Sequence, residues 1–262
     1  MISVYRIGAL IRRHLLMQNR DLNRIFEVFL WPFFDLISWG FIGSWIARDA
    51  VMTTAGYIPL YGMFFWQLFF QAHLSIAVGV LDEVWSKNVS NLLSSPLRSV
   101  EWIGALMCLG MVRIAAVFVL CSVIVWVFFS TTVLCFGWLL LPIIMLVMMS
   151  GWTTGCLCAA LIIRWGTRVA PFLWATWILA SLSGVFTPLN ALPPVIQSIG
   201  LCLPTTYPYV MMHTYLSGGS VPTMLIVQGF LVNGIYWCCS LLVFAWFFKQ
   251  TKEYGVTRLE AE

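Results

Sequence analysis

The sequence predicts an all-α integral membrane protein with about six transmembrane helices. Hydrophobic residues make up 61% of the 262 residues and charged residues only 9%, whereas roughly a quarter of the residues in a soluble domain are charged. The apolar residues also form continuous runs, and about 20 helical residues are enough to cross the hydrocarbon core of a bilayer. Lysine and arginine are distributed unevenly between alternate loops. A water-soluble surface cannot be built from this composition.

The N-terminal segment, residues 1–24, differs from the apolar runs that follow it. Apolar residues alternate there with Arg6, Arg12, Arg13 and His14, which is typical of an amphipathic helix lying in the membrane interface. The segment lacks a short apolar core followed by a small-residue cleavage site, so it is not expected to be a removable signal peptide. We expect it to rest on the cytoplasmic leaflet.

Six apolar runs predict the spans, at residues 29–46, 57–80, 102–129, 133–163, 170–186 and 223–248. The third run is too long for one crossing, so its first two turns are expected at the cytoplasmic interface. The fourth run contains Pro142 and the small-residue pair Gly151 and Gly155. These residues predict a kink and a close contact with a neighbouring helix.

The orientation follows from the basic residues. Cytoplasmic loops of membrane proteins carry an excess of lysine and arginine. With both termini in the cytoplasm, only Arg48 faces outward, Arg113 lies within a run, and the other basic residues are cytoplasmic: Arg6, Arg12, Arg13, Arg20, Arg24, Lys87, Arg98, Arg164, Arg168, Lys249, Lys252 and Arg258. We therefore predict a multi-pass protein of the cell inner (plasma) membrane. The net charge of +4 reflects this orientation, and nothing in the sequence indicates nucleic-acid binding.

The most polar internal stretch is the predicted cytoplasmic loop at residues 81–102. A helix from Asp82 to Leu93, ended by Pro96, would group apolar residues on one side and place Glu83 and Lys87 one turn apart on another. The apolar group comprises Val84, Val89, Leu92 and Leu93. Such a helix can dock into a groove on a partner protein. An ordinary polar loop packed against its own spans agrees equally well with these residues.

The segment at residues 187–221 is apolar but cannot form one straight helix. It contains Pro188, Pro193, Pro194, Pro204 and Pro208, and proline interrupts a helix interior. Irregular backbone at membrane depth is tolerated only where the protein itself covers it. We expect a short broken hairpin that dips into the outer leaflet before the last span.

Two segments resemble the permease subunits of the ABC transporter type-2 (ABC-2) family. EVWSKNVSNLLSSPLRSVEWIGALM, residues 83–107, is similar to the cytoplasmic coupling loop of that family, and SGVFTPLNALPPVIQSIGLCLPTTYPYVMMHTYLSGG, residues 183–219, is similar to its exterior re-entrant hairpin. The family often has Gly-Thr where this chain has Lys87 and Asn88, so the subfamily stays open. Topology and spacing extend the resemblance over almost the whole chain, as a single permease domain.

The resemblance implies an exporter of amphipathic molecules, such as a lipid-linked glycan, a lipid or a hydrophobic small molecule. A second permease copy and two ATPase subunits would be the partners, and the bilayer is the environment. Coupling to the ATPase would fall on Glu83, Lys87, Leu92, Leu93, Pro96 and Arg98, and the re-entrant hairpin would contain Pro188, Pro193, Pro194 and Pro204.

The chain carries no motif for chemistry of its own. The only lysines are Lys87, Lys249 and Lys252, and none follows a glycine as a phosphate-binding P-loop requires. ATP and Mg²⁺ would therefore be bound by a separate ATPase, with no cofactor in this chain. We expect no catalytic residues and no metal site, because the three histidines are far apart and the eight cysteines show no metal-binding spacing.

Two charges inside the apolar runs need an explanation, since intramembrane ionisable residues are costly. Asp35 lies one turn after Trp31 in the first run, and both are candidates for the translocation path. Asp35 can equally pair with a neighbouring helix or be buried in its protonated form. For Arg113 we favour a side chain that extends to the headgroup region over a salt bridge to Asp35.

Two other functional classes compete with the exporter. A membrane-embedded enzyme acting on lipid-linked substrates would need an acid, base or metal cluster, and the polar loops contain none. A channel or secondary transporter would be expected to show more intramembrane charges or an inverted repeat. We find neither pattern.

Overall fold

The structure is a computed structural model, and it describes residues 8, 22–49, 56–94 and 98–254. Within these residues the chain is 88% helical and has no strands, and it contains five helices that are long and apolar enough to cross a membrane. The predicted interfacial segment at residues 1–24 lies almost wholly outside the described residues. The all-α membrane class is thus confirmed at the level of helix length and composition.

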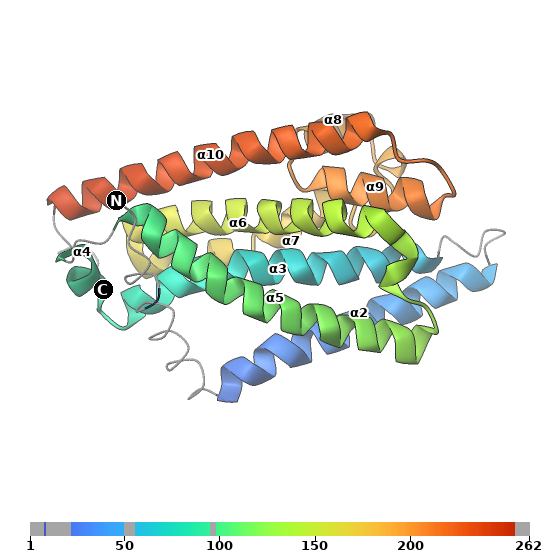
Figure 1. The fold of residues 1–262 in the computed structure, drawn as a ribbon, viewed down its shortest axis with the longest axis horizontal. Coiled ribbons are helices and arrows are strands. Elements are labelled where there is room, and N and C mark those ends of the chain that lie inside the picture. The colour runs from blue at the N-terminus through green and yellow to red at the C-terminus, as the bar shows by residue number, and fades with distance from the viewer. Residues whose placement is uncertain (1–7, 9–21, 50–55, 95–97, 255–262) are drawn as a thin grey trace.

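The long helices are α2 (Leu22–Asp49), α3 (Tyr57–Trp85), α5 (Ser99–Phe129), α6 (Leu140–Trp165) and α10 (Thr223–Tyr254). In Figure 1, α3 and α6 run side by side, α2 and α5 cross α3 obliquely, and α10 lies along α6. Helix α3 is the central one, because it packs against α2, α5 and α6. In its most apolar stretch, 83% of the residues are buried.

The core comprises two clusters of apolar side chains along α3. One cluster surrounds Phe64, Phe65 and Phe69 and extends to the start of α6 and to α9. The other surrounds Ile76 and Val80 and extends to the far ends of α6 and α10. Both halves of α3 therefore contribute to the core.

Five of the predicted spans each contain one long helix, and the run at residues 170–186 does not. Residues 170–186 form part of the 3₁₀ helix η3 (Gly166–Leu173) and the short helix α7 (Thr176–Leu182). Gly166 and Gly184 both have positive φ angles, of 71° and 78°, which only glycine adopts readily, and Pro171 lies inside η3. This segment is not one membrane-length helix, and a count of six spans stays a prediction.

The kink expected at Pro142 lies elsewhere. Pro142 is the third residue of α6, where a missing N–H costs no helical hydrogen bond. The break occurs at Gly137, with φ 54°, inside the preceding 3₁₀ helix η2 (Val133–Leu139). The expectation was wrong because a proline interrupts a helix only when a full turn precedes it.

The predicted hairpin consists of η4 (Leu189–Ala191), α8 (Pro194–Cys202) and α9 (Thr206–Leu216). Pro188 and Pro193 directly precede η4 and α8, Pro194 is the first residue of α8, and Pro204 lies between α8 and α9. In Figure 1, α8 and α9 lie at the end of the bundle opposite the short helix α4 (Val89–Ser94). The prolines therefore divide this segment as predicted, while its depth in a membrane stays a prediction.

Candidate functional site

The first candidate region is one face of α3 that carries polar side chains through the middle of the molecule. Gln67, Gln71, Ser75 and Asp82 fall within about 80° of the helix circumference, at 100° per residue. The first three are 2%, 4% and 6% exposed. We call these four residues the α3 polar face. A polar stripe on the most buried helix of a membrane protein is costly unless partners satisfy it.

Asp35 of α2 contacts one end of the α3 polar face. The Gln67 Nε2 amide donates a hydrogen bond of 2.9 Å to Asp35 Oδ2. Of the alternatives for Asp35, this contact favours pairing with a neighbouring helix. Trp31, its neighbour one turn earlier, is 62% exposed and is therefore directed away from the core. The two residues proposed for a translocation path thus lie in different surroundings.

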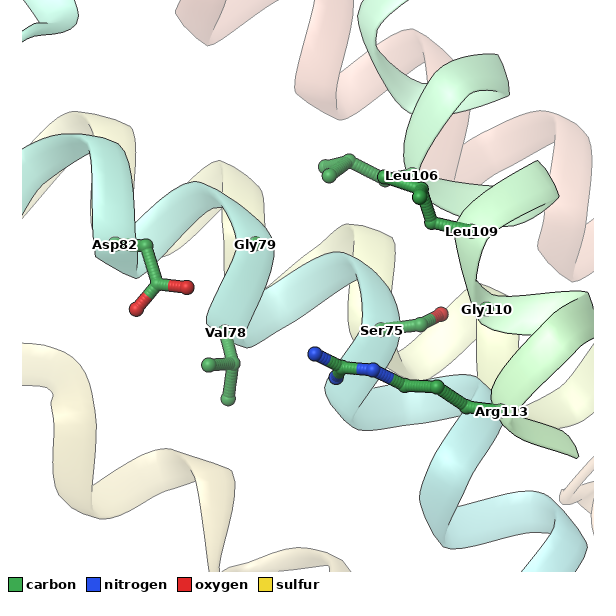
Figure 2. Close-up of a pocket in the computed structure, with 8 residues that line it drawn as sticks. All are labelled: Ser75, Val78, Gly79, Asp82, Leu106, Leu109, Gly110 and Arg113. Atoms are coloured by element: carbon green, nitrogen blue, oxygen red, sulfur yellow. The ribbon is translucent and has the colours of Figure 1, made fainter. Parts of the chain in front are cut away.

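Arg113 of α5 lies towards the other end of the same face. It lines a small pocket between α3 and α5 together with Ser75, Val78, Gly79, Asp82, Leu106, Leu109 and Gly110. Figure 2 shows its side chain extending from α5 towards the part of α3 that carries Asp82. Asp35 is beside Gln67, eight residues or about 12 Å of helix away from Ser75. The position of Arg113 agrees with a side chain that reaches towards the end of the bundle predicted to be cytoplasmic.

The opposite face of α3 packs closely against α6. A Cβ atom on Gly151 would lie 2.5 Å from the Phe69 carbonyl oxygen, and one on Gly155 would lie 2.6 Å from the His73 carbonyl oxygen. Real Cβ atoms essentially never approach that closely. The predicted close contact at this small-residue pair is therefore confirmed, and α3 is the neighbour it contacts.

The predicted coupling helix is divided into two elements. Helix α3 ends at Trp85, and α4 begins at Val89. Lys87 between them has φ 53°, a left-handed conformation that a helix interior does not contain. The continuous helix from Asp82 to Leu93 was therefore wrong. The apolar periodicity of a helix is present in the sequence. Periodicity does not reveal a single residue, here Lys87, whose left-handed conformation separates two helices.

Glu83 is buried, contrary to the exposed charge pair that its spacing from Lys87 predicted. It is 1% exposed, and its Oε2 accepts a hydrogen bond of 2.7 Å from Asn88 Nδ2. The Asn88 N–H also donates to the Glu83 carbonyl oxygen, at 3.0 Å. Lys87 is exposed. Glu83 therefore stabilises the turn between α3 and α4.

The apolar residues of this loop pack against their own chain. Val84, Val89 and Leu92 are each at most 5% exposed and belong to the second core cluster. Leu93 is the fifth residue of α4, and Pro96 lies outside the described residues. Arg98 is exposed and precedes α5, and its N–H donates to Glu101 Oε2 at 3.1 Å, as in a capping box. Coupling to an ATPase stays a prediction for the six residues named for it: Glu83, Lys87, Leu92, Leu93, Pro96 and Arg98.

The hairpin is held by polar contacts that the sequence analysis did not identify. Residue 208 is a proline, so no N–H is available four residues after Pro204 to satisfy the Pro204 carbonyl oxygen. Asn233 of α10, which is fully buried, donates to that oxygen at 3.0 Å. The Ser150 hydroxyl of α6 lies 2.7 Å from Asn233 Oδ1. An asparagine within an apolar run was the available signal.

His213 provides a second anchor for the hairpin. Its Nε2 lies 2.6 Å from the Gly184 carbonyl oxygen and therefore carries the proton. Burial lowers the pKa of His213, and this hydrogen bond opposes the shift. Tyr215 at the end of α9 donates to the Cys135 carbonyl oxygen of η2. The hairpin is thus attached to α10, to the turn after α7 and to η2.

A comparison with models of known protein families found no match, and a comparison with curated proteins found none either. The resemblance to ABC-2 permeases therefore rests on the two quoted segments and on topology.

Proposed function

We propose that the chain is the transmembrane permease subunit of an ATP-driven, ABC-2 type exporter. It would move an amphipathic substrate, such as a lipid-linked glycan, a lipid or a hydrophobic small molecule, out of the cytoplasm or inner leaflet. The observation that carries the proposal is the short helix α4, set off from α3 by Lys87 and placed between two membrane-length helices. It lies at the end of the bundle opposite the hairpin (Figure 1).

The burial of Leu92 changes the expected form of coupling. A side chain in the same core cluster as Ile163 and Phe247 can transmit a displacement of α4 to α3, α6 and α10. The residues available to a partner are the exposed ones, including Lys87, Asn91 and Arg98. We therefore expect the ATPase to contact the polar side of α4 and its flanking turns. Two ATPase subunits would bind ATP and Mg²⁺ and act on two permease copies.

The large apolar side chains on the outside of the bundle support a membrane environment and a second copy. Helices α2, α5 and α10 expose Trp45, Trp126 and Trp246, at 60–65%. Lipid and another permease can each cover such surfaces. Asp35 and Trp31 remain the candidates for the path between two permease copies.

Co-purification tests the proposal directly. The full chain, expressed with its candidate ATPase, should retain that subunit in detergent, and ATP hydrolysis should require the ATPase. Replacing both Lys87 and Arg98 by glutamate should abolish retention at unchanged membrane abundance. Lys249→Glu is the matched control, because its side chain is 77% exposed in the last helix. ATP hydrolysis by the isolated chain, or retention that the double variant leaves intact, would contradict the proposal.

A further inference from the structure

The hairpin and the last helix contain one side chain that can gain a positive charge near neutral pH. Residues 169–248 include no aspartate, glutamate, lysine or arginine, and His213 is their only histidine. His213 lies on α9, at the end of the bundle opposite α4 (Figure 1). Histidine is the side chain that ordinarily changes its charge between pH 5 and 8. A response of the hairpin to mild acid should therefore originate at His213.

His213 connects α9 to the turn after α7, residues 183–187. Its Nε2 lies 2.6 Å from the carbonyl oxygen of Gly184, whose φ of 78° is one that only glycine adopts readily. The next residue of the turn, Val185, packs against α3, because a Cβ atom on Gly62 would collide with the Val185 carbonyl oxygen. The hydrogen bond from His213 thus links α9 to a turn that is packed directly on the central helix.

The two ring nitrogens of His213 have different surroundings. Nε2 faces a carbonyl oxygen, which only accepts, so Nε2 carries the proton of the neutral ring. Nδ1 is buried and has no hydrogen-bond partner among the described residues. A second proton would create a buried N–H without an acceptor and a buried positive charge. The hydrogen bond to Gly184 favours the charged ring, but burial is the larger effect and lowers the pKa of His213 from 6.5.

The helices packed against α9 place their charged residues far from His213. Helix α9 contacts α3, α6 and α10, and it lies at the ends of α6 and α10 where Gly229 approaches Leu146 and Met211. The charged residues of the described parts of α3, α6 and α10 lie towards the opposite ends of these helices: Asp82, Glu83, Arg164, Lys249, Lys252 and Glu253. None of them is placed to stabilise a charge on His213.

The other groups around the hairpin leave His213 as the group that titrates. Helix α2 contacts the turn through Trp39, which stacks on Phe186. Asp35, one turn before Trp39, accepts the hydrogen bond from Gln67. Arg48 follows Trp39 by nine residues, or about 14 Å of helix. The remaining groups are phenols and thiols, which are uncharged at and below about pH 7: Tyr61, Tyr209, Tyr215, Cys135 and Cys202.

We propose that the hydrogen bond from His213 to Gly184 is an acid-sensitive contact that holds α9 to the turn after α7. The neutral ring donates to Gly184 and keeps α9 closed on the turn. The ring gains its second proton from solvent in an open form, in which α9 has moved away from the turn and water reaches Nδ1. Asn233 and Tyr215 still attach the hairpin to α10 and η2 through bonds that do not titrate, so the opening is local.

The direction of the pH dependence follows from proton linkage. In the open form the ring titrates near its ordinary pKa of 6.5, whereas in the closed form its pKa is lower. Above pH 6.5 both forms are neutral and the contact has its full strength. As the pH falls below 6.5, the open form binds a proton that the closed form does not, and opening becomes easier. The predicted orientation makes the exterior pH the relevant one, and the inference does not rest on the exporter function.

Hydrogen exchange of the full chain in lipid nanodiscs, followed by mass spectrometry, tests this contact. Exchange is compared at about pH 7.5 and about pH 5, with exchange times scaled for the intrinsic pH dependence of amide exchange. Peptides covering residues 183–187 and 206–216 should lose protection by about tenfold at the lower pH, the change that one pKa unit between the two forms produces. Peptides from α6 should keep their protection. In His213→Gln, whose amide can donate to Gly184 but does not titrate, protection should be equal at both pH values.

Matched variants separate titration from a merely structural role. Ser183→Ala removes the contact of the Ser183 hydroxyl with Thr205 in the same turn, so it should lower protection at both pH values and keep their ratio. His73→Gln, on α3, should also keep the wild-type ratio. If His213→Gln fails to fold, His213→Leu takes its place, since it does not titrate either. The proposal is overturned if the wild type is equally protected at both pH values, if the neutral variant at position 213 keeps the wild-type ratio, if Ser183→Ala or His73→Gln abolishes it, or if α6 loses protection to the same extent as α9.

Discussion

The two faces of α3 contact their neighbouring helices in different ways, one through close backbone packing and the other through polar side chains. Towards α6, Gly151 and Gly155 let the backbones approach until no Cβ atom fits. Towards α2 and α5, the α3 polar face meets Asp35 and Arg113. Dispersion forces between closely packed atoms stabilise the first contact. Hydrogen bonds and charges, each of modest net value, stabilise the second.

This difference indicates which contact stays fixed and which one changes. A close backbone contact has no alternative packing of similar energy, because any displacement opens a void. Polar side chains can exchange partners, including water or a substrate headgroup, at a smaller cost. We infer that α3 and α6 form a rigid pair.

Larger residues at the glycine contact should have the largest effect. Replacing both Gly151 and Gly155 by leucine should destabilise the protein by more than about 3 kcal/mol, because the backbones must separate. Even Gly151→Ala should destabilise it, although alanine favours a helix interior over glycine by about 0.5–1 kcal/mol. Thermal unfolding in detergent measures both.

The control for this prediction is Gly234→Ala in α10. Nothing lies within 4 Å of a Cβ atom there, so alanine should leave stability unchanged or raise it. Equal behaviour of Gly151→Ala and Gly234→Ala would show that the α3–α6 contact is loose.

Truncation of Leu92 should have the next largest effect. Leu92 is 5% exposed in the core cluster that surrounds the end of α3. Leu92→Ala should therefore cost about 2 kcal/mol, at the lower end for buried leucines because α4 is short. The loss should be measurable by thermal unfolding of the isolated chain, with no ATPase present.

Val100→Ala is the matched control, since Val100 is 53% exposed at the start of α5. It should change stability by less than about 0.5 kcal/mol. If Leu92→Ala has a normal unfolding temperature but no longer binds the ATPase, Leu92 contacts the ATPase directly and does not stabilise the core.

The long helices could be predicted from the sequence because hydropathy and length alone specify them. Breaks depend on single residues, and here the prediction failed. Lys87 and Ser130 have positive φ angles with no sequence signature. Gly166 just before the fifth run and Pro171 within it were available as signals that the run would not form one helix. Glycine and proline mark a break only when the neighbouring packing allows the chain to turn.

The candidate site was predicted only in part. Asp35 was identified as a charge that needs a partner, but the partner could not be named because no local pattern links residues 35 and 67. The spacing of Gln67, Gln71 and Ser75, four residues apart in an apolar run, would have revealed the α3 polar face. Burial of Glu83 was not predictable, since its spacing from Lys87 is equally typical of a solvated helix.

The hydrogen bond between Asp35 and Gln67 should have a smaller effect than the glycine contact. A cycle of Asp35→Ala, Gln67→Ala and the double variant isolates their coupling energy. Interhelical hydrogen bonds in membranes average about 0.6 kcal/mol and reach about 1.7 kcal/mol, so the coupling should fall in that range. Unfolding free energies in one detergent provide the measurement. Asp35→Ala with Asn233→Ala is the control pair, and additive effects are expected there. A coupling above 3 kcal/mol would make the polar face as rigid as the glycine face.

The smallest change in stability is expected at Lys87, in the turn that follows the end of α3. Lys87 has φ 53°, which costs a residue with a Cβ atom about 1–2 kcal/mol. Lys87→Gly removes that cost but increases the freedom of the unfolded chain, so a net stabilisation of about 0–1 kcal/mol should remain. Lys87→Val should destabilise, because a branched side chain disfavours this conformation most. Asn91→Gly inside α4 should have the opposite sign, with a loss of about 0.3 kcal/mol, because glycine is the weaker helix former. Unfolding temperatures in the order Gly, Lys, Val at position 87 would confirm that the turn is a fixed element, which the Asn88 to Glu83 hydrogen bond of 2.7 Å supports. If all three variants unfold at one temperature, the turn adapts its conformation, and α4 is not held to α3 by the backbone.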